Sequence, residues 1–252
     1  MARMERFADK VVFITGAAAG IGRATAQRLA DEGASLYLVD VAREGLEGTA
    51  SLCAEAGAKV EHALCDVSDE AQMRSNVQAC TDAFGRLDVL CNIAGILLLD
   101  HFDKIRVEDF RRVLEVNLVG TFLTCQAALP QLLRTQGNIV NTSSTSALAG
   151  MPYGAAYGTS KGGVSALTRT LAVEYGYKGL RCNAVNPGSI TTAMGSGGNL
   201  PEDANMRLVA RAMPLKTPRG PEVIASVIAM LASEDGIHIN GEEIRVDDGT
   251  LA

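Results

Sequence analysis

The chain has 252 residues, of which 47% are hydrophobic and 21% are charged, and its formal net charge is −6. A chain of this length can bury a full core, and α/β folds of this size are often one domain, so we expect a single domain over residues 1–252. Binding of a polyanion requires clustered Lys and Arg. No such cluster is evident, so nucleic acid is not an expected partner.

The amino-terminal segment MARMERFADKVVFITG is too charged, and its apolar run too short, for a signal peptide. No later stretch looks long and apolar enough to span a bilayer, so we expect a soluble, cytoplasmic protein with no membrane partner. The cysteines form no CxxC pair and have no His at ligand spacing. We expect free, mostly buried thiols at Cys53, Cys65, Cys80, Cys91, Cys125 and Cys182.

Short β-branched runs alternate with longer segments of helical periodicity along the chain. The first strand–helix pairs are KVVFIT with GRATAQRLADEG, ASLYLVD with AREGLEGTASLCAEAG, and KVEHALCDV with DEAQMRSNVQACTDAFG. There follow LDVLCNIAG, a helix from about Glu108 to Arg134, NIVNTSS, a helix from about Ala155 to Tyr177, LRCNAVNPG and EEIRVDD. This alternation predicts a doubly wound α/β fold, with a parallel seven-stranded sheet flanked by helices on both faces.

One irregular stretch interrupts the alternation, from Pro187 to about Pro218, with GSGGNLPED at its centre. A loop this long in a compact domain is usually functional. We therefore expect a lid over a substrate site at about residues 188–218.

A glycine-rich turn, TGAAAGIG from Thr15 to Gly22, lies where the first predicted strand gives way to the first helix. Gly16 permits the tight turn, Gly20 lets the backbone approach a pyrophosphate, and Gly22 allows the helix to pack closely on the strand. The spacing is GxxxGxG rather than GxGxxG, and a tight loop without any ligand could carry the same glycines. The position directly after the first strand favours a dinucleotide site.

Asp40 ends the second predicted strand, roughly twenty residues beyond the glycine turn. A carboxylate there can accept hydrogen bonds from the adenosine ribose hydroxyls and would repel a 2′-phosphate, which favours NAD over NADP. The alternative is an ordinary strand-end Asp that faces water. Arg43 lies nearby in the sequence and could soften the discrimination against a phosphate.

Tyr157 and Lys161 occur in the segment YGTSK, and this spacing places both side chains on one face of a helix. A free tyrosine has a pKa of about 10, and an adjacent ammonium would stabilise the phenolate and lower that pKa. Such a pair also occurs by chance on solvated helices. It therefore predicts an acid–base pair only in company with further motifs.

The motifs, taken together, resemble those of the short-chain dehydrogenase/reductase family over nearly the whole chain. In chain order they are TGAAAGIG; Asp66 with Val67; NIAG from Asn92 to Gly95; Asn117 in VNLVG; NTSS ending at Ser144; YGTSK; and NPGSITT from Asn186 to Thr192. Two positions depart from the family's pattern: Ile93 replaces a usual Asn, and Asp248 stands where glycine is frequent. The resemblance implies a Rossmann fold and an NAD(H)-dependent oxidoreductase that interconverts a secondary alcohol and a ketone.

The resemblance also implies a catalytic set of four residues. Ser144, rather than its neighbour Ser143, would hydrogen-bond the substrate oxygen, and Tyr157 would exchange a proton with that oxygen. Lys161 would hold the nicotinamide ribose and lower the pKa of Tyr157, while Asn117 would position a water in a proton relay. Alternatively, Asn117 and the two serines are polar strand and helix ends that satisfy backbone groups.

The contacts to NAD carry over in the same way. Asp66 and Val67 would contact the adenine, and the segment after the fourth strand would pass beneath the adenosine ribose. The full expected cofactor set is Gly16, Ala19, Gly20, Ile21, Gly22, Asp40, Asp66, Val67, Asn92, Ala94, Gly95, Tyr157, Lys161, Pro187, Gly188, Ile190 and Thr192. No metal is expected.

The expected walls of the substrate pocket, GILLL and STSALAGMPY, are mostly apolar and contain no Arg or Lys, which predicts a largely apolar alcohol or ketone. An NADPH-dependent 3-oxoacyl-carrier-protein reductase is the alternative, against which Asp40 argues. A non-catalytic nucleotide-binding regulatory protein is a more remote one. The two long helices carry apolar residues on more than one face, and together with the resemblance this implies a homotetramer or homodimer.

Overall fold

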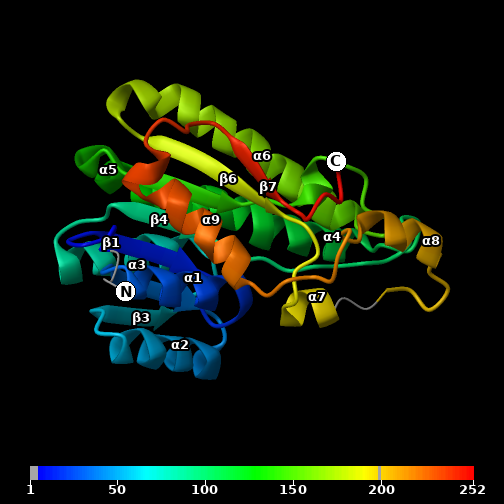
Figure 1. Ribbon diagram of the computed structural model, residues 1–252, viewed down its shortest axis with the longest axis horizontal. Coiled ribbons are helices and arrows are strands. Elements are labelled where there is room, and N and C mark those ends of the chain that lie inside the picture. Colours follow the sequence, from blue (N-terminus) through cyan, green and yellow to red (C-terminus); the bar gives the residue numbers. More distant parts are fainter. Residues whose placement is uncertain (1–4, 198–199) are drawn as a thin grey trace.

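The computed structural model describes residues 5–197 and 200–252, and its strands form one parallel sheet in the order β3-β2-β1-β4-β5-β6-β7 (Figure 1). The strands are β1 (Val11–Thr15), β2 (Ser35–Asp40), β3 (Val60–Leu64), β4 (Val89–Asn92), β5 (Asn138–Thr142), β6 (Arg181–Pro187) and β7 (Glu243–Val246). The order reverses between β1 and β4, which is where doubly wound sheets bind their ligands. The predicted fold class is confirmed.

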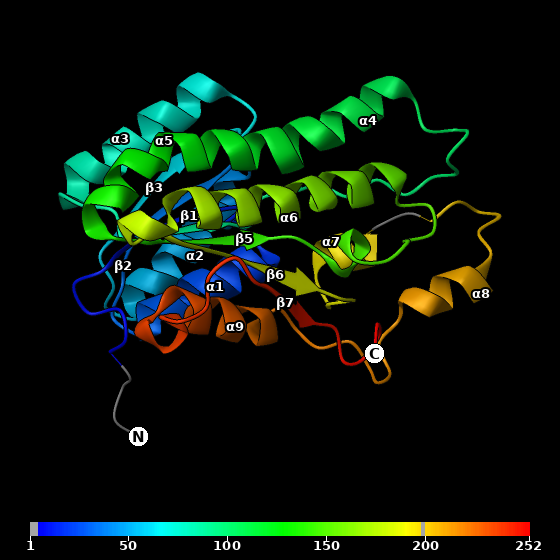
Figure 2. The ribbon, with the colours of Figure 1, turned by 90° about the horizontal axis from the view of Figure 1, so that it is seen from above.

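Helices cover both faces of this sheet (Figure 2). One face carries α1 (Gly20–Asp31), α2 (Arg43–Glu55) and α9 (Glu222–Ala232). The other carries α3 (Glu70–Phe84), α4 (Val107–Leu114), α5 (Gly120–Thr135) and α6 (Ala155–Tyr175). Right-handed crossovers of a chain that reverses direction at β1 produce this two-sided arrangement.

The core lies in two layers, one on each side of the sheet. The strand β1 contributes side chains to both layers, which explains why four of its five residues, VVFI, are apolar. Val12 and Ile14 pack in the layer that contains α1 and α9, whereas Val11 and Phe13 pack in the layer that contains α3 and α5. Side chains alternate between the two faces of a strand, so a strand covered on both faces needs a continuous apolar run.

The predicted helix at about Glu108–Arg134 is observed as α4, a π-helical turn at Glu115–Val119, and α5. Joined, Val107–Thr135 is long enough to cross a bilayer and contains an 18-residue stretch that is apolar enough, with a mean hydropathy of 1.3. The prediction that no stretch would reach this threshold is therefore wrong. The physical reason is packing: the helix contacts α3 and α6 over the sheet, so it needs a wide apolar face.

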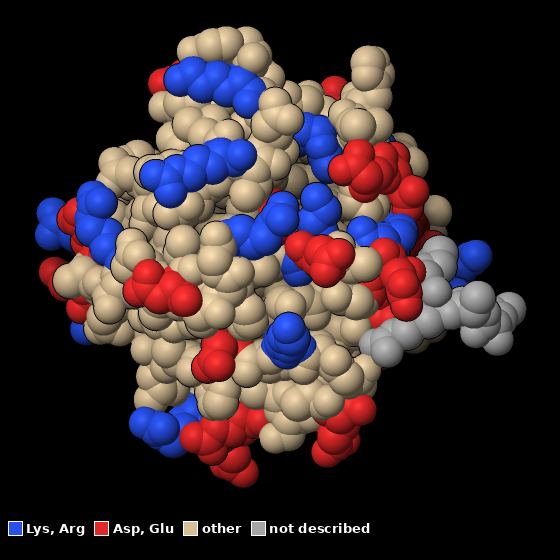
Figure 3. Space-filling view, turned by 90° about the vertical axis from the view of Figure 1, so that its left-hand side faces the viewer, with Lys and Arg blue, Asp and Glu red and all other residues tan. Residues whose placement is uncertain are grey.

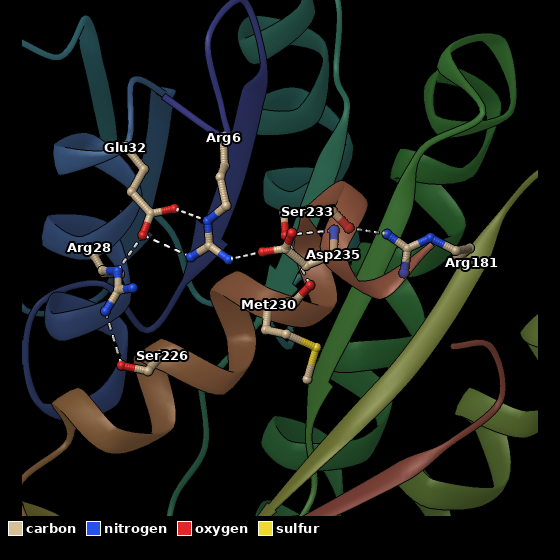
Figure 4. Close-up of polar contacts among 8 residues, drawn as sticks. All are labelled: Arg6, Arg28, Glu32, Arg181, Ser226, Met230, Ser233 and Asp235. Carbon is tan, nitrogen blue, oxygen red and sulfur yellow. Dashed lines mark hydrogen bonds and ion pairs between the residues drawn. The ribbon is translucent and has the colours of Figure 1, made fainter. Parts of the chain in front are cut away.

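A polar network joins the amino-terminal segment to α1 and α9 (Figure 4). Arg6 donates to both carboxylate oxygens of Glu32, over 2.6 Å from Nε and 2.8 Å from Nη2, and also pairs with Asp235. Arg28 pairs with the same carboxylate and reaches Ser226 Oγ at 3.1 Å. Burial raises the pKa of Glu32, but the two guanidinium groups outweigh burial, so the net pKa is lowered.

Figure 3 shows the end of the molecule that lies on the left of Figure 1, away from α7 (Ala193–Gly197) and α8 (Met206–Val209). Basic and acidic side chains are interspersed on this face. Mixed charges of this kind produce no extended field of one sign.

Residues 188–197, residues 200–218 and the carboxyl-terminal residues lie at the opposite end, beyond the ends of β6 and β7 (Figure 1). Where the sequence predicted a long loop, the described part of this segment contains α7, α8 and a 3₁₀ turn at Ala210–Ala212. The irregular segment thus has local structure of its own, which helps to place side chains over the sheet end.

Candidate active site

A cavity of about 630 Å³ opens at the carboxyl ends of the strands. One end is lined by the glycine-rich turn and the ends of β2 and β3. The other end is lined by residues after β5, the first turns of α6, and parts of the 188–218 segment. Both the position and the volume are typical of a small-molecule site in a doubly wound fold.

The glycine-rich turn brings backbone to the cavity wall without side chains. Gly16 has a φ of +70° and Gly20 a φ of +52°, a region that favours glycine. A Cβ on Gly22 would lie 1.9 Å from the carbonyl oxygen of Gly16, so a larger residue would displace α1 from the strand. The amino terminus of α1 faces this bare turn, so the residues present fit a dinucleotide pyrophosphate.

Asp40 lies beside this turn and is held by its own neighbourhood. Its Oδ2 accepts a hydrogen bond from Ala18 N and its Oδ1 from Ala42 N, both at 2.9 Å. Arg43 is directed elsewhere, since it pairs with Glu47 at 3.5 Å and does not line the cavity. A carboxylate therefore lines the wall at the end of β2 without the basic neighbour that the sequence suggested.

Asp66 and Val67 line the same end of the cavity, after β3. The Asp66 carboxylate accepts hydrogen bonds from Ser68 Oγ at 2.6 Å and Arg112 Nη2 at 3.3 Å, and these contacts lower its pKa. Arg112 comes from α4 and also lines the cavity. No motif pointed to it, because a helix remote in sequence brings it there.

Three of the four expected catalytic side chains meet at the other end. A side-chain hydrogen bond joins Ser144, which follows β5, to Tyr157 in the first turn of α6. Lys161 lies one turn further, with Nζ 5.7 Å from the centroid of the Tyr157 ring. The same Nζ donates to the carbonyl oxygen of Thr142 at 2.7 Å. All three side chains line the cavity.

The electrostatics of this group differ from the sequence-based expectation. Burial raises the pKa of Tyr157, and the hydrogen bond with Ser144 opposes this only in part. Burial also lowers the pKa of Lys161 to about 8. The expectation that Lys161 lowers the pKa of Tyr157 is therefore not met, because desolvation dominates at both groups.

Two expected residues, Asn117 and Asn92, do not line the main cavity. Asn117, on the π-helical turn, accepts from Ile96 N at 2.8 Å and donates to Ile96 O at 2.9 Å and to Ser160 Oγ at 3.0 Å. It thus ties the loop after β4 to α6 beside Lys161. The Asn92 side chain points into the core, where its Nδ2 donates to Asn141 Oδ1 at 2.9 Å.

The remaining expected cofactor residues all line the cavity: Gly16, Ala19, Gly20, Ile21, Gly22, Ala94, Gly95, Pro187, Gly188, Ile190 and Thr192. The structure adds others that no motif marked, among them Leu200, Val209, Arg211, Met213 and Leu251. The irregular composition of the 188–218 stretch pointed to the segment but not to these residues. Arg211 adds a basic side chain to the cavity wall, whereas the segments GILLL and STSALAGMPY contain none.

Two hydrogen bonds join the 188–218 segment to neighbouring loops. Asn205 N donates to the hydroxyl of Tyr153 at 2.7 Å. His101 Nε2 lies 2.8 Å from Asp203 Oδ1, and that contact is the first among those that lower the pKa of Asp203. Both contacts lie on the amino-terminal side of α8 and fix that part of the segment beside the loops after β4 and β5.

Asp248, one of the two departures from the family's pattern, holds the other side of the segment. It adopts a φ of +48° without being glycine. Its Oδ2 accepts from Lys216 N at 2.8 Å, and its backbone carbonyl accepts from Leu215 N at 3.4 Å. An Asp side chain tolerates this conformation better than most, and here it supplies an acceptor that glycine lacks.

Within residues 5–197 and 200–252, no group of three or more His, Cys, Asp or Glu is placed to hold a metal ion. The six cysteines are buried and free, as predicted. Burial raises the pKa of these thiols, for example to about 12 for Cys91 and Cys125. Such thiols are inert packing groups rather than nucleophiles.

Comparisons with known proteins agree with this site. Residues 16–250 match the family model described as Enoyl-(Acyl carrier protein) reductase. The chain is 41% identical to the levodione reductase of Leifsonia aquatica and 38% identical to the meso-2,3-butanediol dehydrogenase of Serratia marcescens, in both cases over 98% of this chain and 96% of the relative. Its fold is similar to that of a short-chain dehydrogenase from Mycobacterium paratuberculosis bound to NAD, with a TM-score of 0.91, 31% identity, and coverage of 97% of this chain and 98% of that one. The chain therefore belongs to the short-chain dehydrogenase/reductase family and is an oxidoreductase.

Proposed function

We propose that this protein is an NAD(H)-dependent oxidoreductase that interconverts a secondary alcohol and a ketone, with Tyr157 as the general acid–base. The observation that carries the proposal is the meeting of Ser144, Tyr157 and Lys161 at one end of a cavity whose other end is a glycine-lined cradle. The names of the two relatives, a reductase of levodione and a dehydrogenase of butanediol, support the reaction class.

The nicotinamide, when bound, supplies hydride transfer, and the protein supplies orientation and proton transfer. Ser144 Oγ would donate a hydrogen bond to the substrate oxygen. Tyr157 Oη would donate a proton to that oxygen during reduction and accept one during oxidation. Their mutual hydrogen bond supports a role at the same substrate atom. Lys161 would hold the nicotinamide ribose, while Asn117 would keep the loop after β4 in register with α6.

Asp40 supports the choice of NAD over NADP. Its carboxylate is held at the cavity wall, and Arg43 is paired with Glu47 outside the lining. A 2′-phosphate would meet a negative charge there rather than a guanidinium. The name of another relative, the 3-oxoacyl-(acyl-carrier-protein) reductase of Thermotoga maritima, 37% identical over 98% of this chain, favours a second candidate, an NADPH-dependent 3-oxoacyl-carrier-protein reductase. A clear preference for NADPH in kcat/KM on a reducible ketone would overturn the role given to Asp40 and favour that candidate instead.

The proposal also covers the lid over the site, the assembly of subunits and the cellular location. Residues 188–218 act as the substrate lid of one domain that spans residues 1–252, and the substrate body is largely apolar. Val173 and Tyr177, at the end of α6 and just beyond it, are 84% and 81% exposed, which supports a subunit interface of a homotetramer or homodimer. Light scattering that finds a monomer at micromolar concentration would contradict this. Six reduced thiols support a cytoplasmic location.

Replacement of Tyr157 tests the proposed chemistry. A panel of secondary alcohols with NAD⁺, read by NADH absorbance, identifies a substrate, and Tyr157→Phe should then abolish its turnover while NADH binding stays intact. Tyr175→Phe is the matched control, since it makes the same change at the other end of α6. If Tyr157→Phe stayed active, the assigned proton donor would be wrong. If wild type bound NADH but turned over no alcohol or ketone, a regulatory protein without turnover would be the better assignment.

A further inference from the structure

The substrate end of the cavity is apolar over most of its wall. It is lined by Leu97, Leu99, Met151, Leu200, Val209 and Met213, among others. The only carboxylates that line the cavity in the described chain are Asp40 and Asp66, and both belong to the opposite end. No described acidic side chain therefore lines the substrate end.

One basic side chain stands out among the three that line the cavity. Lys161 donates to the carbonyl oxygen of Thr142, and Arg112 donates to Ser68 and Asp66. Arg211, in contrast, makes no hydrogen bond or ion pair with any residue in the described ranges 5–197 and 200–252. Guanidinium groups have five donors in a planar fork that matches a carboxylate. Arg211 thus lines the cavity with none of its donors engaged by a described residue.

The backbone that carries Arg211 is held on both sides. The residue lies in the 3₁₀ turn Ala210–Ala212, which continues α8. Before it, Asn205 is bonded to the Tyr153 hydroxyl; after it, Lys216 N is bonded to Asp248. Arg211 lines the cavity and is also exposed to solvent, so the cost of desolvating its charge on ligand binding is small.

We propose that Arg211 determines substrate specificity by binding a carboxylate at the far end of the substrate, away from the reacting carbon. This inference rests on the proposed alcohol–ketone oxidoreduction and narrows its substrate class to molecules with an apolar body and a terminal carboxylate. The apolar walls receive the body, and the guanidinium receives the carboxylate by paired N–H···O hydrogen bonds. A neutral substrate of the same shape would leave the guanidinium in water.

The kinetic test compares straight-chain methyl ketones that end in a carboxylate with the matching terminal amides, over a series of chain lengths. Wild type should show, at one length, a kcat/KM for the carboxylate about tenfold above that for the amide. Arg211→Gln should remove this preference by lowering the kcat/KM for the carboxylate about tenfold, to the level of the amide. Arg207→Gln is the matched control, because Arg207 lies on α8 of the same segment but does not line the cavity.

A binding arm separates this inference from the proposed function. Calorimetry on the NAD⁺-saturated protein measures affinity for saturated straight-chain carboxylates and their amides, which do not react. A carboxylate preference that Arg211→Gln abolishes and Arg207→Gln keeps supports the inference, even if no ketone is turned over and the proposed function fails. A preference that is absent from wild type, or that survives in Arg211→Gln, overturns the inference while leaving the oxidoreductase proposal in place.

Discussion

Asp40→Asn is the change that most directly tests how this protein selects its dinucleotide. The substitution keeps the shape of the side chain and removes its charge. One of its two oxygens becomes an amide nitrogen, so either Ala18 N or Ala42 N loses its acceptor. Loss of one hydrogen bond of this kind destabilises a protein by about 1 kcal/mol, which a small fall in Tm would show.

The effect on cofactor choice has two parts. Weaker hydrogen bonds to the adenosine ribose cost about 1 kcal/mol of binding free energy, so kcat/KM with NADH should fall roughly fivefold. Two like charges 4 Å apart repel by about 4 kcal/mol at an effective dielectric constant of about 20. Solvent and salt reduce that repulsion to about 2 kcal/mol at a partly exposed wall, so kcat/KM with NADPH should rise roughly thirtyfold. The NADH/NADPH ratio should therefore fall about a hundredfold.

The assay is kcat/KM with each dinucleotide on one ketone, for wild type, Asp40→Asn and Glu44→Gln. Glu44 is an exposed carboxylate in the first turn of α2 that does not line the cavity, so it reports the general effect of removing a negative charge. Its ratio should change less than about threefold. An unchanged ratio in Asp40→Asn, or an equal change in both variants, would refute the role assigned to the Asp40 carboxylate.

Three further predictions concern the acid–base pair, the ion-pair network and the lid. Because burial raises the pKa of Tyr157, alcohol oxidation, which needs the phenolate, should keep rising to about pH 10 and beyond, whereas ketone reduction, which needs the phenol, should stay nearly constant between about pH 7 and about pH 9; parallel profiles would contradict the assignment. Glu32→Gln should lower the free energy of unfolding near neutral pH by about 2 kcal/mol in urea titrations. Since the folded pKa of Glu32 lies below its ordinary value of 4.5, the stabilisation is present above that value and lost as pH falls through the folded pKa; a difference undiminished in acid would argue against the ion pairs. Asp248→Ala should raise KM for the substrate about fivefold with little change in kcat, because it removes the acceptor for Lys216 N; an unchanged KM would show that this contact does not hold the lid.

Much of the fold and the cofactor end of the site could be predicted from local patterns. The run VVFIT indicated a strand covered on both faces, and Gly16, Gly20 and Gly22 indicated a turn that only small residues permit. These inferences work because strand burial and backbone conformation depend on neighbours in sequence. The spacing of Tyr157 and Lys161 likewise placed both side chains on one helical face, and both line the cavity.

Other features could not be predicted, because they depend on contacts between distant segments. The pKa of Tyr157 follows from how completely the cavity wall is desolvated, which no spacing of residues reveals. Asn92 faces Asn141 on the neighbouring strand rather than the cavity, since only strand pairing decides which way that end of β4 turns its side chain. The apolar length of Val107–Thr135 indicates a bilayer or a core equally well until its packing partners are known.

The sequence by itself determined the alternation of strands and helices, the glycine-lined turn and the placement of Tyr157 and Lys161 on one helical face, because each depends on residues within a few turns of one another. Only the tertiary structure decided which charges line the cavity. Arg112 and Arg211 reach it from α4 and from the turn after α8, while Arg43, close to Asp40 in sequence, is directed away. A side chain's partners in space depend on how whole segments pack, and that packing is a property of the complete chain.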